Sequence, residues 1–326
     1  MLAAMSQPVS LPVVAEVVRS GFVEGRHHGS VVALGAAGEI DWAVGDVTSP
    51  ILPRSCNKPL QAVAMVRAGL DLPPQLLALG CASHSGEQFH VDGVRDILTR
   101  AGLDESALRN PVDLPLDAEE RDRLLRSGGA ADVLHMNCSG KHATMLATCV
   151  ANGWDTETYL DPVHPLQVAI RATFEELTGE EAVVAIDGCG APLLSTSLTG
   201  LARAFARLAT AADGAERRVA DAIRQHPAYV SGTRRDERVL LGALPGAIAK
   251  FGAEACEVVA LSDGRAFALK IEDGGDRARP VVMAAALVRS GVDTAPGVDG
   301  AAVRATGEAP LLGGGRVVGE VRAVLA

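Results

Sequence analysis

The chain has 326 residues, of which 48% are hydrophobic, 21% are charged and only 3% are aromatic. This composition excludes a fibrous or disordered chain, and the length allows about two domains or one larger layered unit. Thirty Lys plus Arg against 40 Asp plus Glu give a formal net charge of −10, which makes nucleic acid an unexpected partner.

The predicted elements begin with an antiparallel meander. Short β-rich runs at 13–18, 30–34 and 40–44 are separated by glycine turns. From Lys58 the apolar residues recur with a helical period, and helices are expected to dominate up to about residue 250. These helices are expected from 58 to a stop at Gly69, and then over 91–101, 118–126, 142–151, 165–177, 198–210, 216–225 and 239–251.

A strand-like run at 182–186 interrupts the predicted helices, and the β signal returns near the C-terminus. The later elements are expected as a hairpin over 257–261 and 266–272, a helix over 281–290 and a glycine-rich strand pair near 313–325. We therefore expect an α+β fold of the layered α/β kind, in one unit. Its sheet layer comes from about 10–55 and 255–326, and its inserted helical layer from about 56–250.

The six cysteines are expected to be free thiols, because a chain of this size without a targeting segment is expected to be cytoplasmic. Residues 1–15 carry no Lys or Arg before an apolar stretch, so they do not resemble a secretory signal, and no apolar run is long enough to span a membrane. Cys81, Cys149 and Cys256 follow or precede apolar runs and are expected in the core. The remaining three lie beside polar or turn-forming residues, where chemistry is more frequent.

Ser55 precedes Lys58 by three residues at the point where a strand region gives way to a helix. At this spacing in a first helical turn, the lysine amine can reach the serine hydroxyl. Lys58 is then a candidate base and Ser55 a candidate nucleophile. The structural alternative is an N-cap serine followed by a solvated lysine, since S-x-x-K is frequent by chance.

Three further segments concentrate reactive side chains. Ser83-His84-Ser85-Gly86-Glu87 is either a functional cluster or a serine-rich turn before a helix. The stretch 137–142, Asn-Cys-Ser-Gly-Lys-His, is either an anion-binding helix entry or a plain helix start. Asp187-Gly188-Cys189-Gly190 follows a strand end. Cys138 and Cys189 together could bind a soft metal, although two thiolates fall short of the four ligands usual for structural zinc.

Taken together, these segments resemble the L-asparaginase II family, the Rhizobium-type thermolabile asparaginases. The stretch 23–29, Val-Glu-Gly-Arg-His-His-Gly, and the surroundings of Lys250 and Lys270 extend the likeness to about residue 275. The resemblance implies a serine β-lactamase-like fold and the hydrolysis of L-asparagine to L-aspartate and ammonia through an acyl-enzyme.

The resemblance also implies roles for individual residues. Ser55 would be the nucleophile with Lys58, and Ser83 with Lys250 would form a second pair beside it. Arg54 would hold the substrate carboxylate and Asp187 its ammonium group. The full set comprises the catalytic residues Ser55, Lys58, Ser83 and Lys250, the substrate-binding residues Arg54, His142 and Asp187, and the zinc ligands Cys138, Lys141 and Cys189. No organic cofactor is expected.

Other functions remain open at this stage. Glutaminase or other small-amide hydrolase activity is close, because one methylene in a pocket is worth only about 1–3 kcal/mol. A non-catalytic, zinc-dependent binding module is a further alternative. A β-lactamase-type activity is disfavoured, because K-T-G is absent and Ser262-Asp263-Gly264 is a turn. The expected partners are the small-molecule substrate and a second copy in a homodimer, with no membrane.

Overall fold

The structure is a computed structural model that describes residues 11–325. Eight strands form one antiparallel sheet in the order β6-β7-β8-β2-β1-β10-β9, and β3 pairs with β2 outside this path. The strands are β1 (Val13–Arg19), β2 (Phe22–Leu34), β3 (Ile40–Val44), β6 (Ile248–Gly252), β7 (Cys256–Ala260), β8 (Ala266–Ile271), β9 (Pro310–Gly313) and β10 (Arg316–Ala323). Residues 1–10 lie outside the described range, and they include most of the stretch in which no secretory signal is expected.

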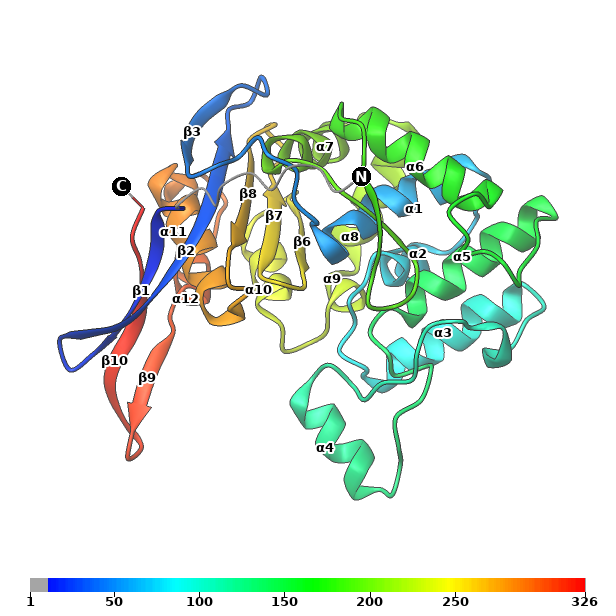
Figure 1. Cartoon of the computed structure of the whole chain (residues 1–326), viewed down its shortest axis with the longest axis horizontal. Coiled ribbons are helices and arrows are strands. Elements are labelled where there is room, and N and C mark those ends of the chain that lie inside the picture. The colour runs from blue at the N-terminus through cyan, green and yellow to red at the C-terminus, as the bar shows by residue number, and fades with distance from the viewer. Residues whose placement is uncertain (1–10, 326) are drawn as a thin grey trace, which may run out of the picture.

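Pairing between the two ends of the chain builds the sheet. Strand β1 pairs with β10, with Val17 opposite Val321, and β2 pairs with β8, with Val31 opposite Leu269. Figure 1 shows these N-terminal strands in blue beside the orange and red C-terminal ones. The sequence-based expectation of an α+β fold with one sheet from both chain ends is therefore confirmed.

Alternate residues of the central strands enter two separate cores, as the period of a β-strand requires. Val258 and Ala268 face the core shared with the larger helical layer. Val259 and Phe267 face the core under the C-terminal helices. Because both faces are apolar, the sheet is covered on both sides.

Helices cover both faces of the sheet (Figure 1). The larger layer contains α1 (Lys58–Arg67), α2 (Pro74–Gly80), α3 (Gln88–Arg100), α4 (Ala118–Arg126), α5 (Ser139–Asn152), α6 (Pro165–Thr178), α7 (Leu198–Thr210), α8 (Gly214–Gln225) and α9 (Pro227–Val230). Helices α10 (Asp236–Ala243), α11 (Arg279–Arg289) and α12 (Gly300–Thr306) contribute to the second core. Over residues 11–325, the helices are too short or too polar for any of them to cross a bilayer.

The predicted helix over 239–251 is wrong. Helix α10 ends at Ala243, and the chain turns through Pro245 and Gly246, whose φ is 76°, before β6 begins at Ile248. Lys250 therefore lies on the edge strand of the sheet instead of on a helix. The strand predicted at 182–186 forms as β4 (Val184–Ile186), which pairs with β5 (Pro192–Leu194) in a separate ribbon.

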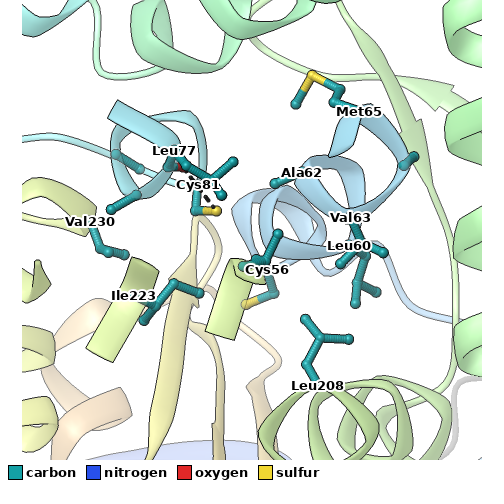
Figure 2. Packing of buried hydrophobic residues seen from close by; sticks show 14 of the residues in the cluster. Cys56, Leu60, Ala62, Val63, Met65, Leu77, Cys81, Leu208, Ile223 and Val230 are labelled. Atoms are coloured by element: carbon teal, nitrogen blue, oxygen red, sulfur yellow. Dashed lines mark hydrogen bonds between the residues drawn. The ribbon is translucent and has the colours of Figure 1, made fainter. Parts of the chain in front are cut away.

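The six cysteines are free and buried. Cys81, Cys149 and Cys256 lie in the main core, as predicted. Cys56 lies there too, although its polar neighbours in sequence favour a chemical role, because its thiol turns inward and donates to the Lys250 carbonyl at 3.2 Å. Figure 2 shows Cys56 and Cys81 among the aliphatic side chains that pack α1 and α2 together.

Candidate active site

The turn that carries Ser55 lies against the edge of β6. This turn is the 3-10 helix η1 (Arg54–Asn57), which continues directly into α1. Gly252 on β6 permits the close approach, because a Cβ there would be 2.4 Å from the Pro53 carbonyl oxygen and 3.2 Å from the Ser55 nitrogen. Arg54 adopts a left-handed φ of 53°, a strained conformation for a residue with a side chain.

Lys58 is buried, and its amine reaches past Ser55 to a different serine. Its Nζ donates to Ser83 Oγ at 3.0 Å and to the Ala82 carbonyl at 2.5 Å. The Ser55 hydroxyl is hydrogen-bonded to none of residues 11–325. Among the described residues, Lys58 is thus hydrogen-bonded to Ser83 and not to Ser55, because the loop after α2 brings Ser83 to the lysine.

Backbone hydrogen bonds to two other segments of the chain fix the position of Ser83. The backbone N–H groups of Ser83 and Ser85 donate to the carbonyls of Val230 and Ser231, and that of His84 donates to Asn137. Two other polar side chains of 83–87 have structural partners. His84 Nε2 lies 2.8 Å from Ser139 Oγ, and Glu87 accepts two hydrogen bonds from Thr233, each of 2.7 Å. Ser83 is therefore the member of this cluster that meets the lysine.

Lys250 is paired with a carboxylate that the sequence did not reveal. Its Nζ lies 3.3 Å from both oxygens of Glu237, and both side chains are fully buried. The expected Ser83–Lys250 hydrogen bond does not form among the described residues. Burial lowers the pKa of Lys250, and the Glu237 carboxylate opposes that shift. Burial likewise raises the pKa of Glu237.

One signal in the sequence could have directed attention to these amines. The chain has only four lysines among its 30 Lys plus Arg residues, namely Lys58, Lys141, Lys250 and Lys270. Three of them are almost completely buried and the fourth is half-buried. Lysine is among the residues least often found fully buried, so a chain that places nearly all its lysines inside uses them for more than solubility.

The third predicted cluster forms a thiol–amine centre. Cys138 immediately precedes α5, and Lys141 Nζ on its first turn lies 2.9 Å from Cys189 Sγ. Contact with Cys138 and the charge of Lys141 lower the pKa of Cys189, while the pKa of Cys138 is raised by its contact with Cys189 and by burial. The Cys189 sulfur therefore lies beside Cys138 and the Lys141 amine, in surroundings that favour its thiolate form over that of Cys138.

The donor set of this centre suits a soft divalent metal if the amine takes part. No group of three His, Cys, Asp or Glu side chains able to hold a metal occurs within residues 11–325. Zinc would therefore need the neutral amine of Lys141 beside the sulfurs of Cys138 and Cys189. The donor types fit, because sulfur and nitrogen are both zinc ligands and the Lys141 amine lies 2.9 Å from Cys189 Sγ. Zinc would have to displace the proton of this amine, whose pKa the neighbouring cysteines raise.

His142 presents an unpaired nitrogen beside this centre. Its Nδ1 lies 2.7 Å from the Tyr159 hydroxyl, while its buried Nε2 has no hydrogen-bond partner in the described part of the chain. Burial lowers the pKa of His142 to about 4, and the charges of Lys141 and Lys58 act in the same direction. The charge of Lys58 also lowers the pKa of Lys250, an effect smaller than that of burial. Lys58 thus lies within electrostatic range of both other clusters.

Arg54 and Asp187, expected to bind opposite ends of a substrate, form an ion pair with each other. Arg54 Nε lies 2.7 Å from Asp187 Oδ1, and Glu254 lies 3.9 Å from the Arg54 NH1 group. The second Asp187 oxygen accepts a hydrogen bond from Cys189 Sγ at 3.7 Å. A carboxylate oxygen has more than one acceptor site, so this oxygen can still meet an ammonium group. Hydrogen bonds and charge interactions therefore link the predicted residues to one another. They run from Arg54 and Asp187 to Lys141, and from Lys58 to His142 and Lys250.

Solved structures show general likenesses to this chain. It is similar to a β-lactamase (Mb2281c) from Mycobacterium bovis, at 16% identity and a TM-score of 0.45, over 86% of this chain and 96% of that chain. It is similar to EstCE1, a hydrolase with promiscuous acyltransferase activity, at 12% identity and a TM-score of 0.39, over 76% and 91%. It is also similar to the native form of Mglu, at 13% identity and a TM-score of 0.37, over 81% of this chain and 64% of that chain. At these low values none of the likenesses identifies an activity, and no curated protein matches the chain.

A match to a family model marks the chain as an amidohydrolase. The chain belongs to the L-asparaginase II family, whose model matches residues 15–323. The predicted family is confirmed. Its match also includes the C-terminal strands, beyond the limit near residue 275 that the motif resemblance suggests.

Proposed function

We propose that this protein hydrolyses L-asparagine to L-aspartate and ammonia through an acyl-enzyme on Ser55. The observation that carries the proposal is a buried amine, Lys58, that is hydrogen-bonded to one serine hydroxyl, while the hydroxyl of Ser55, three residues earlier, has no hydrogen-bond partner among residues 11–325. Family membership supports the reaction class. A hydroxyl without a hydrogen-bond partner, one helical turn before a buried amine, is a setting in which a serine can gain nucleophilicity.

In this mechanism a neutral Lys58 takes the proton of Ser55, and the alkoxide attacks the side-chain amide carbon. Protonation of the amide nitrogen releases ammonia and leaves an aspartyl ester, which water hydrolyses with Lys58 again as the base. A lysine serves as a base near neutral pH only in a desolvated or cationic setting. Ser83 would hold the Lys58 amine in place between the two steps.

The substrate would bind across the Arg54–Asp187 pair. Its carboxylate would take the free N–H groups of Arg54, and its ammonium group the second oxygen of Asp187. The unpaired Nε2 of His142 would meet a substrate oxygen. Zinc, where bound, would be held by Cys138, Lys141 and Cys189, and would supply positive charge beside this pocket.

Ammonia release from asparagine and glutamine by the purified chain, with and without a chelator, tests the proposal. We expect asparagine to be the better substrate, and Ser55→Ala to abolish release. Ser85→Ala is the matched control, because it removes a buried hydroxyl that has no partner. Turnover that survives in Ser55→Ala would overturn the assignment. Metal analysis of Cys189→Ser tests the zinc ligands, and bound zinc without amide turnover would favour a binding module.

A further inference from the structure

The carboxylate of Glu237 lies in a buried cluster of charges around one aromatic ring. Lys250 Nζ and the Arg235 guanidinium each lie 4.4 Å from the centre of the Phe251 ring, and the Arg279 guanidinium lies 5.0 Å from it. Three cations on one ring require carboxylates nearby, because an unpaired charge is costly to bury. Glu257 and Asp236 bind Arg279, which leaves Glu237 as the partner of the lysine.

Glu237 and Lys250 form a closed pair. Both carboxylate oxygens lie 3.3 Å from the amine, and neither side chain has another hydrogen-bond partner among residues 11–325. Glu237 lies in the first turn of α10 and Lys250 on the edge strand β6, so the tertiary structure alone brings them together. The Glu237 carboxylate therefore interacts directly with the Lys250 amine alone among residues 11–325.

The two buried lysines of the candidate site consequently have different surroundings. Lys58 faces a hydroxyl and a backbone carbonyl, whereas Lys250 faces a carboxylate. Identical side chains in contrasting environments hold their protons with different strength, which is how one site obtains both an acid and a base. We propose that Glu237 is a positioning residue that keeps Lys250 protonated, so that Lys250 is the proton donor of the site and Lys58 the acceptor.

The proposal rests on the proposed function and completes its proton balance. The Ser55 proton passes to Lys58 as the C–O bond forms, and the Lys250 proton passes to the amide nitrogen as the C–N bond breaks. Transfer of the proton from Lys58 to Lys250 then restores both amines, so no proton is gained or lost. Throughout, Glu237 keeps its negative charge and the orientation of the Lys250 amine.

Several titratable or charged groups act on Lys250 besides Glu237. Burial is the largest effect and lowers the pKa of Lys250, while Glu237 and Lys58 act in opposite directions. The groups packed around the pair are Lys58 and Cys56 from the η1–α1 segment, Cys81 after α2, Arg235 and Asp236 at the start of α10, Glu257 on β7 and Arg279 on α11. Glu237 is the carboxylate among them that contacts the amine, and it raises the pKa of Lys250. Removal of its charge should therefore lower that pKa.

The low number of lysines makes the test direct. With ¹³C at the lysine ε-carbon, the full chain gives four signals to follow with pH, and the one missing from Lys250→Arg is Lys250. We expect Glu237→Gln to lower the Lys250 midpoint by about one pH unit or more. The alkaline limb of the kcat/KM profile for asparagine should move down with it, with about a 10²-fold loss at pH 8. Glu237→Asp keeps the charge and should recover most of both.

Glu257→Gln is the matched control, because it removes another fully buried carboxylate of the same cluster that binds Arg279 and not the lysine. Glu257→Gln should change neither the titration midpoint of Lys250 nor the alkaline limb of the kcat/KM profile. An unchanged midpoint in Glu237→Gln, or an equal shift in Glu257→Gln, would overturn the proposal. If Glu237→Gln does not fold, the wild-type titration decides, since a Lys250 midpoint below pH 7 contradicts a protonated donor. Absence of ammonia release by the wild type would refute the proposed reaction, while the titration would still test the pair.

Discussion

Gly252 lies where edge strand β6 meets the turn that carries Ser55, and its replacement by alanine tests this contact. A Cβ at 252 would be 2.4 Å from the Pro53 carbonyl oxygen, whereas ordinary contact begins at about 3.4 Å. The turn must therefore move by about 1 Å. A displacement of this size in a reacting group costs about 10²-fold in rate, or about 2.7 kcal/mol in the activation barrier. The overpacking costs about 1–3 kcal/mol of stability as well.

The assay is ammonia release from asparagine as a function of substrate concentration, together with urea unfolding. Gly252→Ala should lower kcat about 10²-fold while the protein remains folded. Gly242→Ala is the matched control, because no atom lies within 4 Å of its added Cβ and it stands in helix α10. The control should keep its activity and gain about 0.5–1 kcal/mol. Wild-type turnover in Gly252→Ala would refute the claim that the close approach of β6 positions Ser55.

Three further predictions concern the base, the substrate pocket and the core. Lys58→Met should lower kcat by about 10²–10⁴-fold with an unchanged circular dichroism spectrum, and undiminished turnover would refute the base assignment. Asp187→Asn should raise KM for asparagine about 10-fold or more, and an unchanged KM would remove Asp187 from the pocket. Burial lowers the pKa of His90 to about 4. Because the unfolded chain binds that proton below about pH 6.5 and the folded chain does not, the free energy of unfolding should fall between pH 6.5 and 4. His90→Gln should reduce this loss by up to about 3 kcal/mol in urea titrations, and equal pH slopes would contradict the assignment.

Much of the fold followed from local pattern. The helices at 118–126 and 198–210 form over the predicted residues, and the hairpin of β7 and β8 forms where a turn separates two apolar runs. The error at 239–251 has a local cause as well. The apolar residues continue at a helical spacing across Pro245 and Gly246, but the break there turns the second half into an edge strand.

The members of the candidate site were named from sequence because each stands in a short, distinctive motif. Their partners could not be named in the same way. Glu237 lies in no motif, and nothing in the sequence distinguishes it from Asp236 beside it. The tertiary structure separates them, since Glu237 binds Lys250 and Asp236 binds Arg279.

The sequence by itself determined the elements, the apolar faces of the strands and the set of reactive side chains, because periodicity and motif spacing are properties of neighbouring residues. Only the tertiary structure decided which hydroxyl meets which amine. Ser83 reaches Lys58 from the loop after α2, and Glu237 reaches Lys250 across a turn into the sheet edge. These contacts depend on how separate segments pack, and packing sets the desolvation and charge on which the proton chemistry of a lysine depends.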